Sequence, residues 1–572
     1  MHTAHTWWDK LRQAYEAELG YVFLISGNIS DLFPLNETFL TLKEFVATQL
    51  SGREIVVFWD KAAGFTFGDE IIKSLQEPST GRPRPSIMRE KFKSLITGDA
   101  APSSSSTSSS SLLASLGGLG NATDLPTDPE RSFQLLEKLI STGKLTEKKA
   151  ALILEYAESI LSENDYVSVP SVTLQRWASL DSPLRGTGNP VILIERNPER
   201  VSSAVKHDDS NVVGIHIPRP NRDEHQKFLR WATKAHVVKF GSGLNAPMVA
   251  NLMAGLRCKD FDDFCLVAKT TRKELDERFI WQKKMELIEK QSGGVLRVVR
   301  PKHGFESIGG LEYIKEALRV QVAKLRTGSK TTDKGWILMG PPGTGKTIIA
   351  EALAKESGVN FLMLGNIFSK FVGDSERNMR LAMDIAAAMA PTILFVDEAA
   401  EAIGSGEEYA GDSGVGNRVR GMLQNVMGDD ANRGKLFFIL ATNYPNRLPP
   451  AILREGRMDK RVPLLVPDRE TRKKILEALC TKYQIDAASL DFSFALDQSD
   501  NWTGAQLEAV LLRAKQFAEE TPTQKLTTEI LKNAVEDYIP SRDEAAFLKM
   551  SQLAIEFTNS RRLLPPQVRP QP

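Results

Sequence analysis

One octet constrains the fold of this chain more than any other feature: Gly-Pro-Pro-Gly-Thr-Gly-Lys-Thr, residues 340–347. It fits the phosphate-loop pattern G-x-x-x-x-G-K-[ST] in full. The apolar run 335–339 predicts a strand before the octet, and residues 348–356, rich in Ala and Glu, predict a helix after it. In such a unit the loop N–H groups turn toward phosphate oxygens at the helix N-terminus. The octet therefore predicts a nucleotide site in an α/β domain.

Within the octet, Lys346 is expected to reach the β- and γ-phosphates, and Thr347 is expected to hold Mg²⁺ through its hydroxyl. The other residues are expected to bind the nucleotide through the loop: Gly340, Pro341, Pro342, Gly343, Thr344 and Gly345. Asp397 closes the apolar run 392–396, where Mg²⁺ needs a carboxylate, and Glu398 can polarise the attacking water. Asn443 ends another apolar run and can orient that water; the alternative is a plain turn residue before Tyr444-Pro445.

Charge and cysteine content narrow the function classes. Lys+Arg is 73 and Asp+Glu is 72, which argues against a bulk nucleic-acid or anionic-membrane binder. The sequence has neither 18 consecutive apolar residues nor the charge pattern of a signal peptide, so we expect no membrane anchor. Three cysteines without CxxC spacing predict neither a zinc site nor a disulfide framework, and they favour the cytoplasm.

The second half alternates expected strands, at 336–339, 360–364, 392–396, 435–441 and 461–465, with helical segments. This order predicts a parallel five-stranded sheet between helices. From residue 468 onward the pattern is helical. We therefore expect an ATPase core over 305–467, a helical lid with further helices over 468–560, and a flexible tail over 561–572.

The first half repeats this order without the chemistry. Strands are expected at 21–25, 54–59, 150–154 and 190–194, and residues 26–33 lie where a phosphate loop would fall but contain no lysine. Residues 214–220 resemble 461–467, and we aligned 244–250 with 502–508. Glu155-Tyr156 stands in place of Asp397-Glu398. We expect a degenerate α/β module over 1–98 and 130–285, with a Ser/Gly-rich insertion at 99–129 and a linker at 286–304.

The motif order over about residues 300–545 resembles the AAA branch of the AAA+ ATPases, which includes katanin, NSF, FtsH and the proteasomal ATPases. By that resemblance Ile308 and Gly309, in a loop at 305–311, contact adenine. Arg454 and Arg457 resemble the paired arginine fingers that complete the γ-phosphate site of an adjacent subunit. Gly504 and Ala505 resemble the second sensor of the branch. More loosely, the two-module order resembles an uncharacterised AAA family of bacteria and plastid genomes.

Residues 369–376 resemble the first pore loop of the family, which lines the central channel of a hexamer and grips an extended polypeptide. The matching residues are Lys370, Phe371, Val372 and Gly373. The alternative is that Phe371 packs inside its own domain. Asn417 and Arg418 resemble the second pore loop. The chain departs from the family at Ala399-Ala400, where Ile-Asp is usual, which leaves open how tightly the nucleotide state is coupled to the pore and the neighbour.

Three functions follow from these patterns. The first is Mg²⁺-dependent ATP hydrolysis by a homohexameric ring that remodels or unfolds a protein client. The second is a switch or scaffold that assembles on ATP without threading, which would tolerate Phe371→Ala but not Arg454→Ala. The third is a nucleic-acid motor, which the balanced charge disfavours.

Overall fold

The computed structural model describes most of the chain, in two compact units, 1–280 and 281–572, that we treat separately. Within the described residues, we find no helix with the length and apolar character needed to cross a bilayer. The described ranges are 6–76, 86–97, 125–161, 168–179, 181–196, 211–236, 240–271, 274–327, 329–365, 375–403, 415–521, 524–540 and 544–569.

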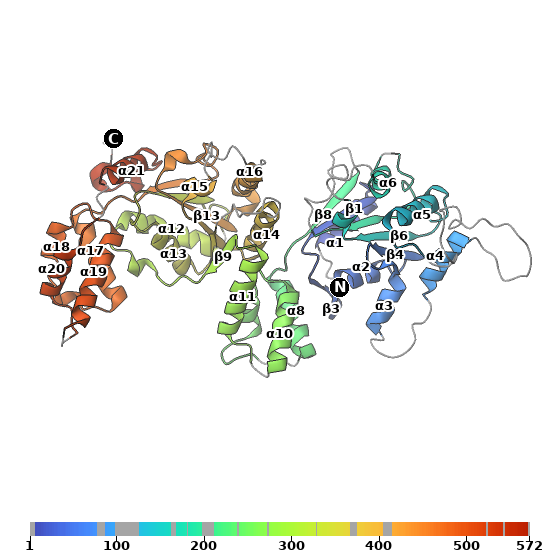
Figure 1. Ribbon diagram of the computed structural model, residues 1–572, viewed down its shortest axis with the longest axis horizontal. Coiled ribbons are helices and arrows are strands. Elements are labelled where there is room, and N and C mark those ends of the chain that lie inside the picture. The colour runs from blue at the N-terminus through green and yellow to red at the C-terminus, as the bar shows by residue number, and fades with distance from the viewer. Residues whose placement is uncertain are drawn as a thin grey trace, which may run out of the picture. The chain divides into compact units, whose positions relative to one another are not determined.

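The second unit contains a six-stranded sheet (Figure 1) with the order β14-β10-β13-β12-β11-β9. Five strands are parallel, and β9 pairs antiparallel with β11 at the edge. Residues of β10, β12 and β13 are buried along their whole length, as expected where helices cover both faces of a sheet. The strands are β9 Leu296–Val299, β10 Gly335–Met339, β11 Asn360–Leu364, β12 Thr392–Val396, β13 Leu436–Thr442 and β14 Lys460–Pro463.

Helices surround this sheet and form a separate bundle after it. The apolar faces of α12 and α13 pack on one face of the sheet around Trp336 and Phe437. Four later helices, α17 to α20, share their own apolar core, the lid (Figure 1). The helices are α12 Glu312–Thr327, α13 Lys346–Ser357, α14 Ser375–Ala388, α15 Ala399–Ile403, α16 Val415–Gly428, α17 Arg469–Tyr483, α18 Ser493–Gln498, α19 Gly504–Glu519, α20 Thr528–Asp537 and α21 Glu544–Glu556.

The first unit repeats the topology of the second. Its main sheet has the order β8-β1-β7-β6-β4-β5 when taken from the β8 edge. The five parallel strands match β14-β10-β13-β12-β11 in both position and chain order. The antiparallel edge strand differs in origin, because β5 follows β4 along the chain whereas β9 precedes β10. The strands are β1 Val22–Gly27, β4 Ile55–Asp60, β5 Gly64–Phe67, β6 Ala150–Glu155, β7 Val191–Ile194 and β8 Val212–Ile217, with a separate hairpin of β2 Leu32–Leu35 and β3 Thr38–Thr41.

The helices of the first unit also follow the second. After the last sheet strand come α8, which has 15 residues like α17, then α9 and α10. In this order α10, which packs on α8, is the counterpart of α19, which packs on α17. The helices are α1 Thr6–Glu16, α2 Leu42–Gln49, α3 Gly68–Gln76, α4 Ile87–Thr97, α5 Pro129–Ser141, α6 Val169–Trp177, α8 Arg222–His236, α9 Ala246–Leu252 and α10 Cys258–Thr271. The next helix, α11 Glu277–Gln291, crosses the boundary at residue 280 and belongs mostly to the second unit.

Three expectations need correction. Residues 502–508 at the start of α19 correspond to the start of α10, and not to residues 244–250 at the start of α9. Helix-start residues alone do not distinguish these two helices of the first unit. The expected linker 286–304 contains the end of α11 and all of β9, because Leu296 and Val298 alternate into the core while β9 pairs with β11. In the expected flexible tail, Leu563 and Leu564 are buried.

Candidate active site

The phosphate loop joins β10 to α13 in a conformation that requires glycine. Gly340 has φ +146, and a Cβ there would lie 1.9 Å from the carbonyl oxygen of Leu464. Gly343 and Gly345 have φ values of +77 and +92, in the left-handed region that favours glycine. Gly345 precedes the helix, so Lys346 and Thr347 form its first turn, where N–H groups lack intrahelical partners. The loop therefore presents backbone donors for an anion.

Lys346 ties the loop to the end of β13. Its Nζ donates to the carbonyl oxygens of Gly340 (2.9 Å) and Pro341 (2.8 Å), and to Asn443 Oδ1 at 2.8 Å. Burial lowers the pKa of Lys346 to about 8, while the charge of Asp397 acts in the opposite direction. The structure thus brings together the predicted phosphate-binding lysine and the predicted water-orienting asparagine.

Asp397 and Glu398 follow β12 directly and are exposed toward a cavity that both line. The Glu398 N–H donates to Asp397 Oδ1 at 3.0 Å. Glu398 has φ +47, a left-handed conformation that costs a non-glycine residue on the order of 1 kcal/mol and is concentrated at functional sites. Tyr156 occupies the same place after β6 with φ 56, so the first unit keeps the turn but has lost the second acid.

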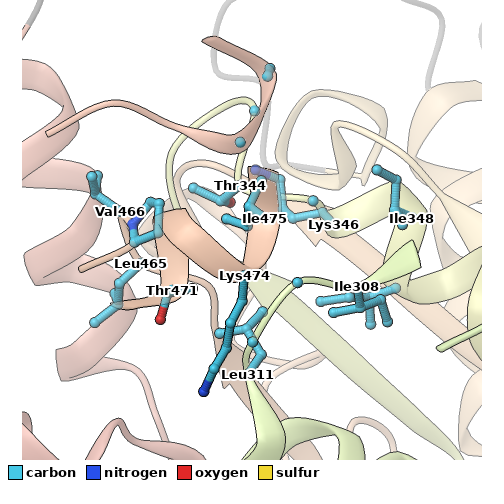
Figure 2. Close-up of a pocket in the computed structure, with 18 of the residues that line it drawn as sticks. Ile308, Leu311, Thr344, Lys346, Ile348, Leu465, Val466, Thr471, Lys474 and Ile475 are labelled. Atoms are coloured by element: carbon cyan, nitrogen blue, oxygen red, sulfur yellow. The ribbon is translucent and has the colours of Figure 1, made fainter. Parts of the chain in front are cut away.

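The cavity has a volume of about 790 Å³ and lies between the phosphate loop and the lid (Figure 2). Thr344 and Lys346 approach it from the loop, and Ile308 and Leu311 approach it from the loop at 305–311. Leu465, Val466, Thr471, Lys474 and Ile475 complete it from the β14–α17 connection and α17. This volume is typical of a small-molecule site.

The loop at 305–311 contacts the lid so closely at Gly309 that a side chain would not fit there. A Cβ on Gly309 would lie 2.4 Å from Ile475 Cα, and Gly310, with φ +68, abuts Thr471. Ile308 and Gly309 both line the cavity. The loop at 305–311 and α17 of the lid are therefore in close steric contact.

The first residues of α19 reach the phosphate loop. The Ala505 N–H donates to the Gly343 carbonyl oxygen at 3.1 Å, and Gly504 and Ala505 line the cavity. Thr503 caps the helix with a capping box to Gln506. The predicted second sensor therefore contacts the phosphate loop through its backbone.

In the first unit, a carboxylate takes over the contact that Gly343 makes. Asp31 follows β1 by four residues, as Gly343 follows β10. Its Oδ1 accepts the N–H of Lys259, the second residue of α10, at 2.9 Å, and the N–H of Leu32 at 2.8 Å. Its Oδ2 accepts from Asn28 Nδ2 at 2.7 Å. Asp31 is buried, and burial raises its pKa to about 6. The sequence analysis gave no role to Asp31; its spacing after the strand was the available signal.

Other predicted residues lie away from this cavity. Arg454 is exposed and Arg457 is half-buried, with Arg457 Nη1 donating to the Ala451 carbonyl oxygen at 3.0 Å. Neither belongs to the described residues that line the cavity. Arg418 pairs with Glu376 at 2.5 Å, joining α16 to α14. The pore-loop residues Lys370, Phe371, Val372 and Gly373, and the side chain of Asn417, lie outside the described residues.

Sequence reasoning missed part of the cavity wall. Asp468 and Thr471, at the start of α17, line it, as does a stretch of the expected tail, residues 565–568. Asp468 caps α17 by accepting a hydrogen bond from the Thr471 N–H at 2.8 Å. An Asp just before a helical segment is a known capping signal, so this cap was predictable from the sequence. Residues 565–568 carry no periodicity from which such a role could be predicted.

Two family models match this chain. The model of the ATPase family associated with various cellular activities (AAA) matches residues 336–465, which hold the phosphate loop, both acids and Asn443. The model of the AAA+ chaperone N-terminal Rossmann-like domain matches residues 2–218, within the first unit. The two matches do not overlap.

Curated relatives agree with the first match. A cell division cycle protein 48 homolog of Archaeoglobus fulgidus is 34% identical over 48% of this chain and 40% of its own length. Protein SAV of Sulfolobus acidocaldarius is 38% identical over 37% of this chain and 28% of its own length. A proteasome-activating nucleotidase of Methanosphaerula palustris is 32% identical over 43% of this chain and 62% of its own length. The chain thus spans less than two thirds of each of these relatives.

Sequence, site geometry and family matches lead to one assignment. The second unit has the phosphate loop, the acid pair and the helical lid in the order of the AAA branch. The first unit has the same order of five parallel strands, without the lysine. The chain therefore contains a AAA domain over residues 336–465, preceded by an AAA+ chaperone N-terminal Rossmann-like domain over residues 2–218.

Proposed function

We propose that this protein hydrolyses ATP at the 790 Å³ cavity of its second unit and uses that energy to remodel a protein client. The observation that carries the proposal is the convergence of three elements on one cavity: the first turn of α13, the acids after β12 and Asn443 after β13. Phosphoryl transfer to water depends on positioning and charge stabilisation, which this arrangement supplies. The printed names of the relatives, among them a proteasome-activating nucleotidase, support action on proteins.

Each side chain has a proposed part in the reaction. Lys346 binds the β- and γ-phosphates and exchanges its contact with Asn443 for them, which frees Asn443 Oδ1 to orient water. Glu398 polarises that water. Glu398 lines the cavity from a turn with φ +47, and such strained conformations are concentrated at functional sites, which supports a catalytic part for it.

Mg²⁺ is part of this proposal. The described residues contain no group of three or more His, Cys, Asp or Glu side chains able to hold a metal by themselves. Mg²⁺ in nucleotide sites takes one or two protein oxygens and completes its shell with phosphates and water, so Thr347 and Asp397 fit it. When bound, the ion neutralises phosphate charge.

We further propose that the protein acts as a homohexameric ring. Support comes from Arg454, which is exposed and outside its own cavity, as a finger for a neighbouring site should be. Lys370 to Gly373 would then line the channel, and the Arg418–Glu376 ion pair would brace the two pore loops at their bases. The cytoplasm is the proposed location, which the unpaired cysteines Cys258, Cys265 and Cys480 support.

The N-terminal module is proposed to keep its shape without nucleotide. Asp31 joins its loop to α10 by hydrogen bonds, while Glu155 is occupied by Lys43 at 2.5 Å. No lysine stands in the loop at 26–33. A module of this kind suits recruitment of a client or partner.

The test is ATP turnover by size-separated oligomers of wild type, Glu398→Gln and Glu401→Gln. Glu401 is a matched control, because it is exposed on α15 three residues away and does not line the cavity. Glu398→Gln should lower turnover about 100-fold or more and trap assembled, ATP-bound protein. Equal turnover in the two variants would contradict the proposed role of Glu398.

A second variant separates remodelling from a simple ATP switch. Phe371→Ala should keep ATP turnover and assembly but lose unfolding of a tagged reporter protein. If the reporter is unfolded as fast as by wild type, threading through the pore fails and the switch is favoured.

A further inference from the structure

Residues 561–569 are fixed to the ATPase core by buried side chains. Two short turns, Arg561–Leu563 and Pro566–Val568, shape the segment. Leu563, only 2% exposed, belongs to the same apolar cluster as Ile314 and Leu318 of α12. Just before the segment, Asn559 accepts from the Arg461 N–H at 3.0 Å and donates to the Asp459 carbonyl oxygen at 2.9 Å. The segment is therefore anchored to α12 and to β14.

This anchoring places residues 565–568 in the wall of the nucleotide cavity. Gln567 Nε2 donates to Asp468 Oδ2 at 3.3 Å, and Asp468 in turn caps α17 through the Thr471 N–H. Thr471 abuts Gly310 of the loop at 305–311. A chain of contacts thus joins Gln567 to that loop, whereas Lys346 and Asn443 define the phosphate end.

Electrostatics place the segment at the same end. Burial and, to a smaller extent, the charge of Asp468 raise the pKa of Tyr313 to about 12, against the opposing charge of Arg569. Arg569 Nε donates to the Leu564 carbonyl oxygen at 3.0 Å, which folds the segment back on itself. The charges of Asp468 and Arg569 therefore both act on Tyr313, which lines the cavity together with Gln567.

The orientation of the Gln567 amide follows from its partner. An ionised carboxylate only accepts hydrogen bonds, so the NH₂ group of Gln567 must face Asp468. Its Oε1 is left as the acceptor. An acceptor suits the exocyclic amino group of adenine and opposes the carbonyl oxygen at the same ring position of guanine.

We infer that residues 565–568 form the base-binding wall of the nucleotide site, and that Gln567 Oε1 selects adenine over guanine. The inference rests on the proposed ATP site. Pro566 and Val568 supply apolar surface beside the base, and the buried anchor at Leu563 holds the wall in place. The wall comes from a part of the chain that follows the lid, so it also links the position of this segment to nucleotide occupancy.

The test measures equilibrium binding of ATP, GTP and tripolyphosphate, which has the phosphates but no base. The variant P565G/P566S/Q567G/V568S removes the wall and keeps Leu563 and Leu564, so the core anchor survives. It should weaken ATP about five- to tenfold and leave tripolyphosphate unchanged, because only the base is affected. Arg562→Ala, exposed and outside the cavity wall, is the control and should bind all three as wild type does.

Gln567→Ala tests selectivity separately, and it should lower the ATP-to-GTP affinity ratio about three- to tenfold. An unchanged ratio overturns the role of Gln567. Unchanged ATP binding by the quadruple variant, or equal weakening of ATP and tripolyphosphate, overturns the base wall. Failure of the wild-type protein to bind ATP contradicts the proposed function instead, and is distinct from each of these results.

Discussion

Asp31 offers a sharp test of how the N-terminal module holds together without a nucleotide. Its carboxylate accepts from the backbone of Leu32 and Lys259, and so joins the loop after β1 to α10. Asp31→Ala removes the acceptor and leaves two partly buried N–H donors without a partner, which should destabilise the module by about 2 kcal/mol. Asp31→Asn keeps one oxygen for both donors and should stay within about 1 kcal/mol of wild type.

The pH dependence of wild type gives an independent magnitude. The pKa of Asp31 is raised from 3.8 to about 6, mainly by burial and slightly by the charge of Asp260. Hydrogen bonds from Lys259, Asn28 and Leu32 act in the opposite direction. Arg257 also faces this carboxylate but is engaged by Asp260 at 2.6 Å. The shift of roughly 2 pKa units corresponds to about 3 kcal/mol. Because the pKa of Asp31 is higher in the folded state, protonation of Asp31 stabilises the folded module. This contribution to the free energy of unfolding is fully present below about pH 4 and is lost as the pH rises through about 6.

Hydrogen–deuterium exchange of the α10 amides in the full chain measures both effects. At about pH 7.5, Asp31→Ala should accelerate exchange of the α10 amides, whereas Asp31→Asn should not. When the pH is lowered to about 5, the α10 amides of wild type should become better protected, and those of the two variants should not. Asp263→Asn is the control, since this carboxylate on α10 is 57% exposed and pairs with Lys259 at the surface. If Asp31→Asn opens α10 as much as Asp31→Ala, the hydrogen-bond argument is refuted.

Other predictions concern the nucleotide site. Gly309→Ala should push the loop at 305–311 off α17 and weaken ATP binding about tenfold or more in a titration, while Gly421→Ala, in open space within α16, should change binding less than twofold. Arg454→Ala should lower ATP turnover on the order of 10³-fold and should lower ATP affinity far less. Arg319→Ala, at another exposed arginine, is the control, and an equal loss of turnover in this variant would contradict a finger role for Arg454. Leu563→Ala should lower the free energy of unfolding of the second unit by about 2–5 kcal/mol, because it leaves a cavity in the apolar core. Calorimetry should show this as a lower melting temperature.

Much of the fold could be predicted because the residues concerned have strict physical requirements. Gly340 and Gly345 adopt positive φ values, so the phosphate loop is legible as a spacing of glycines. The apolar runs at 392–396 and 436–442 are buried on both faces, which makes central parallel strands easy to recognise. The duplicated sheet order followed from the same kind of run.

What escaped prediction depends on contacts between distant segments. The strand β9 has four residues and is stabilised by pairing with β11, so local pattern indicated only a linker. Leu563 and Gln567 lie in a proline-rich stretch without periodicity, and their places follow from α12 and Asp468. The misplaced counterpart of α19 arose because several helix starts share cap chemistry, while tertiary packing decides which one faces the loop.

The roles of Arg454 and Arg457 lie beyond a single chain. Both stand outside the cavity of their own unit, and a finger acts on a neighbour. The same holds for the proposed pore loop at 370–373, whose role as proposed requires an assembly. These assignments are therefore proposals that need an experiment on mixed subunits.

The most direct measurement mixes Glu398→Gln and Arg454→Ala chains in equal amounts and follows ATP turnover of the assembled protein. Each variant alone should be nearly inactive, the first because its site lacks the acid and the second because its neighbour lacks the finger. In mixed rings an Arg454→Ala site beside a Glu398→Gln neighbour is complete, so turnover should recover to about a quarter of wild type, the statistical share of such pairs. Assembly of mixed oligomers without any recovery would contradict a ring of ATPase sites completed by neighbouring subunits.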